Sequence, residues 1–355
     1  MAGRVFDIIE HPIGGRVVAL AIVLLMFSIP VFVMLWMTAV PGQSYTGPLP
    51  SLRPDQAQLA ARLRSHVQQI AAEPHNVDYP AALERSARVI EAELSAAGYD
   101  VRKQEFMAKG QKVRNIEVVI EPASADAKTL VIGAHYDSCG NAPGANDNGT
   151  GTAAVIELAR SLADLRRRSA LRIRLVLFVN EEPPFFKTEQ MGSLVYARRL
   201  GQSGEPVIGM ISLETIGYFS DRRHSQRYPM PLNLLYPDTG NFIAFVGLTS
   251  SRSFVRKTVR SFRRFAAFPT EGGAAPGFIP GIDWSDHWSF AKLGMPALMV
   301  TDTAPFRYPF YHGSGDTPDR IDYERLARVT SGLESVVREW AVGVGHRSSE
   351  QAPRD

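Results

Sequence analysis

The stretch "TLVIGAHYDSCGNAPGANDNGTG", residues 129–151, decides the fold. It opens with an uninterrupted apolar run, which is typical of a strand buried on both faces of a parallel sheet. A glycine-rich loop follows, and the next residues, "GTGTAAVIELARSLADL", predict a helix. A buried strand joined to a helix is the repeating unit of α/β folds. His135 and Asp137 stand at the end of this strand, and Asp147 stands in the loop.

The same alternation continues on both sides of this stretch. Downstream, strands are predicted in "LRIRLVLFVN", "VIGMISLETIG", "NFIAFVG" and "MPALMVTD", and helices in "MGSLVYARRL" and at residues 250–265 and 322–342. Upstream, amphipathic helices at 54–72 and 80–97 precede strand-like runs at 101–107 and 113–120. This alternation predicts an α/β fold with a mostly parallel, mixed central sheet flanked by helices on both faces.

The N-terminal part of the chain carries a long apolar segment. From Val17 to Val40 there are 24 residues without a charge, and a bilayer core needs about 20 such residues in a helix. Pro30 lies inside the segment, which transmembrane helices tolerate. No small-residue cleavage site of the signal-peptide kind follows it. We therefore expect a transmembrane helix at 17–40 that lies in a lipid bilayer, and a buried core helix is the less favoured alternative.

The charges beside this segment predict its orientation. Arg4 and Arg16 precede it, and no further Lys or Arg occurs before Arg53. The basic side faces the cytoplasm in most membrane proteins, so the N-terminus is expected to be cytoplasmic and the bulk of the chain extracytoplasmic. The predicted boundaries are a short N-terminal tail at 1–16, the transmembrane helix at 17–40, a linker at 41–53, the main domain at 54–344 and a polar tail at 345–355.

The overall composition excludes several classes of protein. The net charge is only +3 over 355 residues, and no basic stripe with interleaved aromatic residues occurs, so nucleic acid is not an expected partner. The chain has a single cysteine, Cys139, which rules out an internal disulfide.

The notable polar residues follow the predicted strands. His135 and Asp137 end one strand, Glu181 and Glu182 end the next, and Glu214 ends the third. In open α/β sheets, ligands bind outside the carboxyl ends of the strands. This shared placement predicts that the residues converge on one site.

These residue types suit divalent metal ions. His135 and Asp137 form an H-x-D pair whose side chains share one face of the strand, so the acid can hold one imidazole N–H while the other nitrogen binds metal. With Asp147, Glu182, Glu214 and His312, the set offers two histidines and three acids as ligands, a mixture that zinc accepts and that other divalent metals can share.

Five ligands can hold two metals if one carboxylate bridges them, and the acid in the tight glycine-flanked loop, Asp147, is assigned that role. Two metals about 3.5–4 Å apart can share and activate a water. Adjacent acids are costly alone but favourable beside cations. Glu182 is then expected to bind metal, and Glu181 to act as the general base that passes a proton to the leaving amine.

Each residue alone has an ordinary explanation. A single H-x-D pair is weak evidence, and adjacent glutamates are usually a solvated pair. Asp147 could cap a helix, Glu214 could form an ion pair, and His312 could be a loop histidine. The ordered set H-x-D, G-A-N-D-N-G, E-E, L-E-x-I-G and Y-H-x-x-x-D-T is far more specific than any of its members.

This ordered set resembles the co-catalytic zinc peptidase family, peptidase family M28, which includes bacterial aminopeptidases, glutamate carboxypeptidase II and, more distantly, glutaminyl cyclases. The resemblance covers roughly residues 60–342 and implies a zinc-exopeptidase-like fold with Glu181 as the general base. It also implies a cis peptide bond between Asp147 and Asn148. The implied ligand sets for two Zn²⁺ ions are His135, Asp147 and Glu182 for one ion, and Asp147, Glu214 and His312 for the other.

Five residues near the motifs need separate comment. Glu214 stands where better-known members of the family have Asp, and we interpret it as a tolerated change of ligand. Tyr311 is similar to an oxyanion-stabilising tyrosine of some members, with ordinary packing as the alternative. Asp286 and His287, in "DWSDHWSF", are expected to be structural or to support the ligands. Cys139 could offer a thiolate, although the implied ligand set is complete without it.

The resemblance implies a membrane-anchored metallo-aminopeptidase that acts on a peptide substrate. The insertion 218–246 is expected to wall the pocket, where Asp221 or Asp238 could contact the substrate amine. Three alternatives are a carboxypeptidase, a glutaminyl-cyclase-like cyclotransferase and a non-catalytic receptor-like protein. The presence of all five ligands and the base disfavours the last, and two bound zinc ions, not one, would favour the peptidase over the cyclotransferase.

Overall fold

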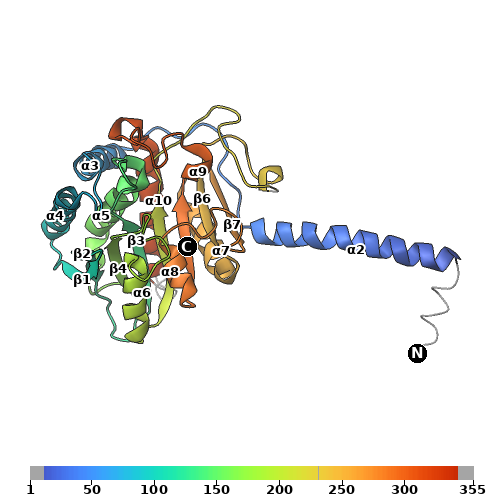
Figure 1. Cartoon of the computed structure of the whole chain (residues 1–355), viewed down its shortest axis with the longest axis horizontal. Helices are drawn as coiled ribbons and strands as arrows, with labels where there is room; N and C mark the ends of the chain where they lie inside the picture. The colour runs from blue at the N-terminus through green and yellow to red at the C-terminus, as the bar shows by residue number, and fades with distance from the viewer. Residues whose placement is uncertain (1–11, 231, 343–355) are drawn as a thin grey trace, which may run out of the picture. The chain divides into compact units, whose positions relative to one another are not determined.

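Eight strands form one mixed sheet in the order β1-β2-β4-β3-β5-β8-β6-β7 (Figure 1). Strands β4, β3, β5 and β8 run parallel to one another, whereas β2 and β6 pair antiparallel with their neighbours β4 and β8. This confirms the predicted mostly parallel, mixed sheet. The strands are β1 Arg102–Ala108, β2 Gln111–Ile120, β3 Thr129–His135, β4 Arg172–Phe178, β5 Val207–Glu214, β6 Ile243–Leu248, β7 Thr270–Ala275 and β8 Ala297–Thr301.

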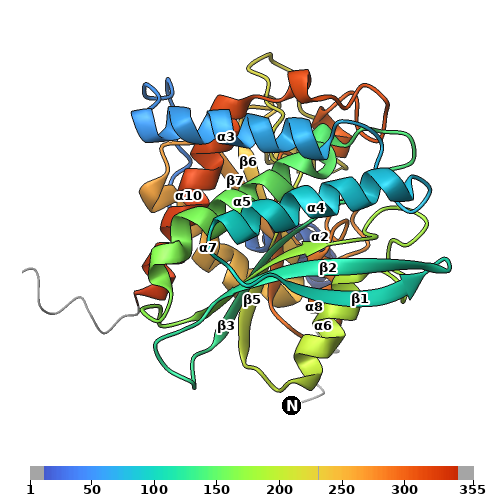
Figure 2. The ribbon, with the colours of Figure 1, turned by 90° about the vertical axis from the view of Figure 1, so that its left-hand side faces the viewer.

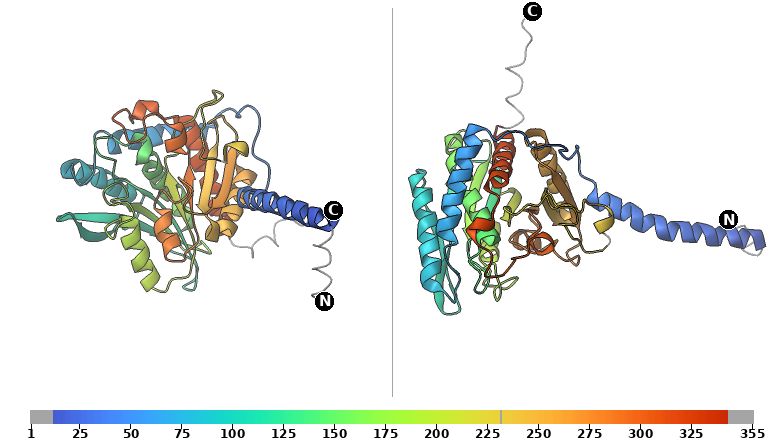
Figure 3. Two further views of the ribbon diagram at one scale, coloured as in Figure 1. Left: turned by 45° about the vertical axis from the view of Figure 1, so that its right-hand side comes forward. Right: turned by 90° about the horizontal axis from the view of Figure 1, so that it is seen from above.

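Helices cover both faces of this sheet, as predicted. Figure 2 shows α3, α4 and α5 in front of it, and Figure 3 shows α10 between α3 and α7, both of which contact α10. Helices α6 and α8 pack on the opposite face. The helices are α3 Pro54–Ile70, α4 Pro80–Ala96, α5 Gly151–Ser161, α6 Gly192–Gln202, α7 Arg252–Phe265, α8 His287–Lys292, α9 Ala304–Arg307 and α10 Tyr323–Ala341, and the short helical turns are η1 Ala145–Thr150, η2 Leu162–Leu165, η3 Leu232–Leu234, η4 Thr249–Ser251 and η5 Pro318–Arg320.

The central strand β3 shows why its sequence is apolar without interruption. Leu130 and Ile132 join the larger core cluster, which includes residues of α5 and α10, whereas Val131 joins a smaller cluster with α6 and α8. Successive side chains of a strand point to opposite faces. Because both faces of β3 are covered, all the positions between its end residues Thr129 and His135 are apolar.

The edge strand β7 and the short helices α8 and α9 were missing from the expected elements. The β7 sequence "TEGGAA" has neither alternation nor β-branched residues beyond its first position, yet it pairs in parallel with β6. A Cβ atom at Gly272 would lie 3.0 Å from Val259 Cγ2 and 3.1 Å from the Phe245 carbonyl oxygen. Glycine therefore lets α7 and β6 approach the edge strand closely.

The N-terminal helix α2, Pro12–Thr38, forms a unit of its own that ends at Ala39. An 18-residue window within its stretch Arg16–Thr38 has a mean hydropathy of 2.9, and none of that window is buried. By length and composition it can cross a membrane, although a signal sequence has the same features. The computed structural model describes residues 12–230 and 232–342, so most of the predicted N-terminal tail and all of the predicted polar tail lie outside the described residues.

Candidate metal centre

Three adjacent parallel strands end where the predicted site residues gather. His135 is the last residue of β3, and Glu214 is the last residue of β5. Glu181 and Glu182 follow β4 within four residues of its end. The carboxyl ends of parallel strands meet at one edge of a sheet, which is where such folds bind ligands. The convergence expected from the strand ends is therefore what the structure has.

The first group of possible metal ligands consists of His135, Asp147 and Glu214. The Nε2 atom of His135 lies 3.3 Å from Asp147 Oδ1 and 3.2 Å from Glu214 Oε2. One ligand atom from each residue lies within 4.8 Å of the other two. All three residues are buried, so this group is enclosed by protein.

The second group shares Asp147 with the first. His312 Nε2 lies 3.2 Å from Asp147 Oδ2 and 3.3 Å from Glu182 Oε2. Asp147 thus turns one carboxylate oxygen to each histidine, as a carboxylate that bridges two cations does. The ion pairs bring Glu214 to His135 and Glu182 to His312, whereas the family resemblance implies Glu182 with His135. Glu182 also forms a group with His135 and Glu181 in which the ligand atoms lie within 4.8 Å of one another, so the assignment of acids to the two ions stays a prediction. Glu214 lies beside His135 because β3 and β5 are neighbours whose last residues are His135 and Glu214.

Asp137 supports the site differently from the expectation. Its carboxylate accepts hydrogen bonds from the backbone N–H groups of Glu181, at 3.1 Å, and Glu182, at 3.2 Å. The Nδ1 atom of His135 bonds instead to the main-chain oxygen of Asp137 at 3.0 Å, with the carboxylate 3.6 Å away. Asp137 therefore fixes both the imidazole and the two glutamates, through its main chain and its side chain respectively.

Asp316, which closes the Y-H-x-x-x-D-T motif, was not assigned a role from the sequence. Its carboxylate accepts hydrogen bonds from the backbone N–H groups of Asn146, at 2.8 Å, and Asp147, at 3.1 Å. Tyr308 donates its hydroxyl to the same carboxylate at 2.8 Å. The motif was visible in the sequence, but the contact of Asp316 with Asp147, across 169 residues, was not.

The loop that carries Asp147 has the backbone that its glycines allow. A cis peptide bond joins Asp147 to Asn148, as the family resemblance implies. Gly144 has a φ of 75°, and a Cβ atom there would lie 2.7 Å from the Asp147 carbonyl oxygen, so only glycine fits. The Asn148 side chain donates to the Leu213 carbonyl oxygen at 2.8 Å and accepts from Thr215 N at 3.2 Å. These bonds tie the loop to the end of β5.

Glu214, the longer replacement for the family's usual aspartate, is held by a serine pair. Ser285 donates to Glu214 Oε2 at 2.9 Å, and its oxygen lies 2.9 Å from Ser212 Oγ. Burial raises the pKa of Glu214 to about 7, against the opposing charge of His135. Despite the extra methylene, the Glu214 carboxylate lies 3.2 Å from His135 Nε2, so Glu214 remains a candidate ligand.

The site holds more carboxylates than imidazoles. Burial raises the pKa of Glu181 and Glu182 well above the usual range, and nearby carboxylates add to this effect against the opposing charge of His135. Burial also acts to raise the pKa of Asp147, but His135 and His312 outweigh it and lower that pKa. Bound cations would stabilise all of these carboxylates in their charged form.

Unpaired buried atoms test whether the residues fit metal ions. His135 Nε2, Asp147 Oδ2 and Glu182 Oε1 are buried and make no hydrogen bond within the described part of the chain. Buried polar atoms in folded proteins are nearly always paired, and these three belong to the two groups above. Imidazole nitrogens and carboxylate oxygens are also a donor set that zinc accepts. The residues therefore fit two divalent cations that share Asp147.

Glu181 and Tyr311 lie beside these groups. Glu181 Oε2 is 3.9 Å from His135 Nε2, and its residue is 7% exposed. The ring of Tyr311 stacks on that of His312 with centroids 3.8 Å apart. Burial and the nearby carboxylates of Asp147 and Glu182 raise the pKa of the tyrosine hydroxyl, so it remains a hydrogen-bond donor.

The remaining predicted residues make other contacts. His287 is fully buried and bonds through Nε2 to the Ile282 carbonyl oxygen at 2.8 Å, which is a structural role. Asp286 is buried, and its burial raises its pKa to about 7 against the opposing charge of His135. Asp221 pairs with Arg325 and Asp238 with His224, so the structure engages both of these carboxylates elsewhere than in the metal-binding groups found among the described residues.

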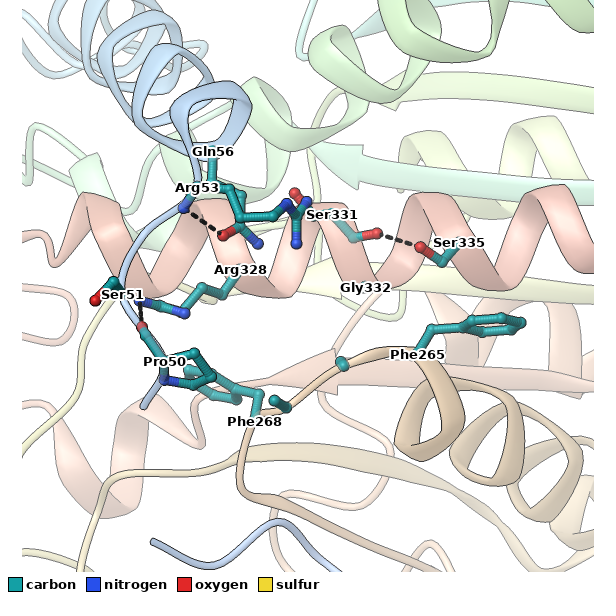
Figure 4. Close-up of a pocket in the computed structure, with 12 residues that line it drawn as sticks. Pro50, Ser51, Arg53, Gln56, Phe265, Phe268, Arg328, Ser331, Gly332 and Ser335 are labelled. Carbon is teal, nitrogen blue, oxygen red and sulfur yellow. Dashed lines mark hydrogen bonds between the residues drawn. The ribbon is translucent and has the colours of Figure 1, made fainter. Parts of the chain in front are cut away.

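A cavity of about 190 Å³ lies away from this centre and shares no residue with it (Figure 4). Its lining comes from the start of α3 and the segment before it, from the region around the end of α7, and from α10. Arg328 donates to the Pro50 carbonyl oxygen at its rim. No group of possible metal ligands among the described residues lines this cavity. The possible metal ligands lie at the ends of the strands.

Comparisons with known proteins agree with this geometry. The profile of peptidase family M28 matches residues 115–337. An Escherichia coli K12 protein described as uncharacterized protein YfbL is 35% identical over 329 residues, which cover 90% of this chain and 97% of that protein. Leucine aminopeptidase 1 of Arthroderma otae is 25% identical over 61% of this chain, and the alignment spans about half of the aminopeptidase, 55%.

Solved structures share the fold at low identity. BSAP, a zinc aminopeptidase from Bacillus subtilis, matches with a TM-score of 0.64 and 16% identity over 82% of this chain and 96% of that one. The glutaminyl cyclase of Fimbriiglobus ruber matches with a TM-score of 0.57 and 21% identity over 84% and 99%.

The mixed sheet flanked by helices defines an α/β fold similar to that of zinc aminopeptidases, with two histidine–carboxylate groups at the edge of the sheet. The chain belongs to peptidase family M28. As a member of that family it is a peptide hydrolase.

Proposed function

We propose that the chain is a membrane-anchored, zinc-dependent aminopeptidase that removes residues from the free N-terminus of a peptide. The observation that carries this proposal is the carboxylate of Asp147, which faces His135 with one oxygen and His312 with the other. The leucine aminopeptidase and zinc aminopeptidase relatives support the exopeptidase assignment.

The proposed ligands are His135, Asp147 and Glu214 for one zinc ion and His312, Asp147 and Glu182 for the other. Two zinc ions held there would polarise the scissile carbonyl and lower the pKa of an attacking water. The bridging carboxylate of Asp147 would hold the two ions next to each other.

Glu181 is the proposed general base. Its backbone N–H donates a hydrogen bond to the Asp137 carboxylate. This bond orients the residue and leaves the Glu181 carboxylate able to accept a proton. It takes a proton from the attacking water and delivers it to the amine that leaves. Tyr311, held against His312, donates its hydroxyl to the negative charge that develops on the carbonyl oxygen.

The insertion 218–246 is proposed to form one wall of the substrate pocket. Arg307 of α9 ties it down by donating to the Gln226 side-chain oxygen at 2.7 Å and to the Phe242 carbonyl oxygen at 2.8 Å. The ring of Tyr218 lies 4.8 Å from that of Tyr308, which holds Asp316 and through it the Asp147 loop. The insertion and the metal centre are thus joined by a short chain of contacts.

The helix α2 is the proposed membrane anchor, with the catalytic domain outside the cytoplasm. Its apolar stretch is long enough to span, and basic residues occur on its N-terminal side and not again before Arg53. Protease added to intact cells would digest the catalytic domain if this topology holds, and would leave it untouched if the domain faced the cytoplasm.

The test uses the full chain purified in detergent, with its metal content measured and with aminoacyl-arylamides, N-acetylated arylamides and N-terminal glutaminyl peptides as substrates. The proposal expects about two zinc ions per chain and cleavage restricted to substrates with a free amine. Cyclisation of the glutaminyl peptide by a protein with one zinc would establish the cyclotransferase instead. Cleavage of the N-blocked substrates at the same rate would refute aminopeptidase specificity.

A further inference from the structure

The thiol of Cys139 lies in the second half of the candidate centre. Its Sγ atom, a carboxylate oxygen of Glu182 and a ring nitrogen of His312 all lie within 4.8 Å of one another. The family resemblance assigns no ligand to this position. The first half of the centre, around His135, has no sulfur in its group, so the two halves differ in their donor atoms.

The backbone on both sides of Cys139 is fixed from outside the loop. The buried side chain of Asn76 donates to the carbonyl oxygens of Ser138 and Gly140, each at 2.8 Å. Ser138 also accepts a hydrogen bond from the backbone N–H of His75 at 2.9 Å and donates its own N–H to the His75 carbonyl oxygen at 3.0 Å. The backbone that carries Cys139 is therefore held by the segment before α4.

One oxygen of the carboxylate next to the thiol has no hydrogen-bond partner among the described residues. Glu182 is 3% exposed, and its Oε1 atom makes no hydrogen bond within the described residues. With His312 Nε2 and one oxygen of Asp147, the second half offers three protein donors before the sulfur is counted. A thiolate would be a fourth protein donor, and zinc can expand to five donors, so a position for the water that the proposed function requires would remain.

We infer that the Cys139 thiolate is an additional ligand of the zinc ion held by His312, Glu182 and Asp147. This inference rests on the proposed metal centre. On binding, the S–H bond breaks, the sulfur keeps the electron pair that it shares with the zinc, and the proton passes to solvent. A thiolate is a soft donor, so this half of the centre selects zinc over magnesium or manganese.

The direct test is X-ray absorption at the zinc edge of the zinc-loaded full chain. The expected spectrum contains a sulfur scatterer at about 2.3 Å beside nitrogen and oxygen at about 2.0–2.1 Å. In Cys139→Ser the sulfur shell disappears, and one of the two zinc ions is bound at least about tenfold more weakly in competition with a chelator. Circular dichroism and retention of the other zinc ion show that the variant is folded.

A second readout uses the fact that Cys139 is the chain's single cysteine. Its alkylation should be at least about tenfold slower with zinc bound, because the thiolate that reacts is engaged, and a chelator should restore the rate. The control is the double variant Cys139→Ser with Ser95→Cys, which moves the thiol to an exposed position on α4. Its alkylation should not respond to zinc.

The outcomes separate this inference from the proposed function. Two bound zinc ions with only nitrogen and oxygen neighbours would overturn the cysteine ligand and leave the proposed function standing. A full chain that binds no zinc would overturn both. A Cys139→Ser variant that is folded and holds both zinc ions with unchanged affinity would also overturn the inference.

Discussion

The two halves of the candidate centre lie on different kinds of structural element. We call the half with His135 and Glu214 sheet-built and the half with His312 and Glu182 loop-built; Asp147 belongs to both. The side chain of His135 is 1% exposed and ends a strand in the middle of the sheet, and its partner Glu214 ends the neighbouring strand. The side chain of His312 is 33% exposed and lies in a loop, on a backbone with a φ of 56°. The first half is fixed by the core, whereas the second is fixed by hydrogen bonds between loops.

This difference shows how the centre can be rigid and accessible together. The sheet-built half holds its ligands through packing that also holds the fold, so changes there disturb the protein widely. The loop-built half faces solvent and carries Tyr311, the proposed oxyanion donor, and Cys139. We expect substrate to approach from the side of His312. Asp147, which joins the halves, is the residue whose loss should affect both.

Asp147→Asn is expected to have the largest effect. An amide cannot give a charged oxygen to each histidine, so both zinc ions should be lost and turnover should fall to background. Metal analysis after dialysis, with thermal unfolding beside it, measures this. Asp316→Asn is the matched control, because Asp316 contacts the same loop without reaching either histidine's Nε2, and it should keep at least one zinc ion. Retention of two ions by Asp147→Asn would contradict the bridge.

Glu181→Gln should separate chemistry from metal binding. The amide keeps the shape of the side chain but cannot take a proton, so turnover should fall by about 10²–10⁴-fold while both zinc ions remain bound. The control is Glu189→Gln, which changes an exposed glutamate of the same loop that pairs with Arg198 and should leave turnover within about twofold. Normal turnover by Glu181→Gln would remove it from the role of base.

Much of the sheet edge that carries the candidate centre could be predicted from the sequence. The apolar runs located the strands, and the strand ends located His135, Glu181, Glu182 and Glu214, because a parallel sheet brings its carboxyl ends together. Glycine spacing located the loop of Asp147. The edge strand β7 was not predicted, since "TEGGAA" has no hydrophobic pattern and depends on β6 and α7 for its pairing.

The contacts among the acids, the histidines and their supporting residues could not be predicted. Which acid joins which histidine depends on the order of strands in the sheet, and the chain order of the motifs does not determine it. Supporting residues such as Asp316 and Ser285 act across 169 and 71 residues. The sequence does not distinguish a buried serine or aspartate that hydrogen-bonds to a metal-binding residue from one that stabilises an ordinary turn.

Ser285→Ala should weaken only the sheet-built half. It removes the hydrogen bond to Glu214, so one of the two zinc ions should bind roughly tenfold more weakly, while the other is unchanged. Ser289→Ala is a close control, because Ser289 forms a similar buried pair with Ser193 at 2.8 Å and touches no predicted ligand. Equal weakening of both ions would show that the two halves are not independently supported.

Asp302→Asn should have the smallest effect on turnover and a visible effect on stability. Asp302 accepts hydrogen bonds from the Asn146 side chain at 2.9 Å and from Tyr218 N at 2.8 Å, and so supports the loop side of the centre. Burial raises its pKa from 3.8 to about 7, against the opposing charge of Arg307. An acid with a raised pKa in the folded state stabilises the fold below pH 4 and loses that contribution as the pH rises through 7.

The free energy of unfolding of the wild type should therefore fall, relative to Asp302→Asn, by roughly 1–4 kcal/mol between pH 4 and pH 8. Asparagine keeps an acceptor for both hydrogen bonds and cannot ionise, so this slope should be absent from the variant. Urea unfolding of both proteins at a series of pH values measures the difference, in which contributions common to the two proteins cancel. If the free energy of unfolding had the same pH dependence in both proteins, Asp302 would not be held protonated. The loop that carries Asp147 would then depend on Asp316 as its buried hydrogen-bond acceptor.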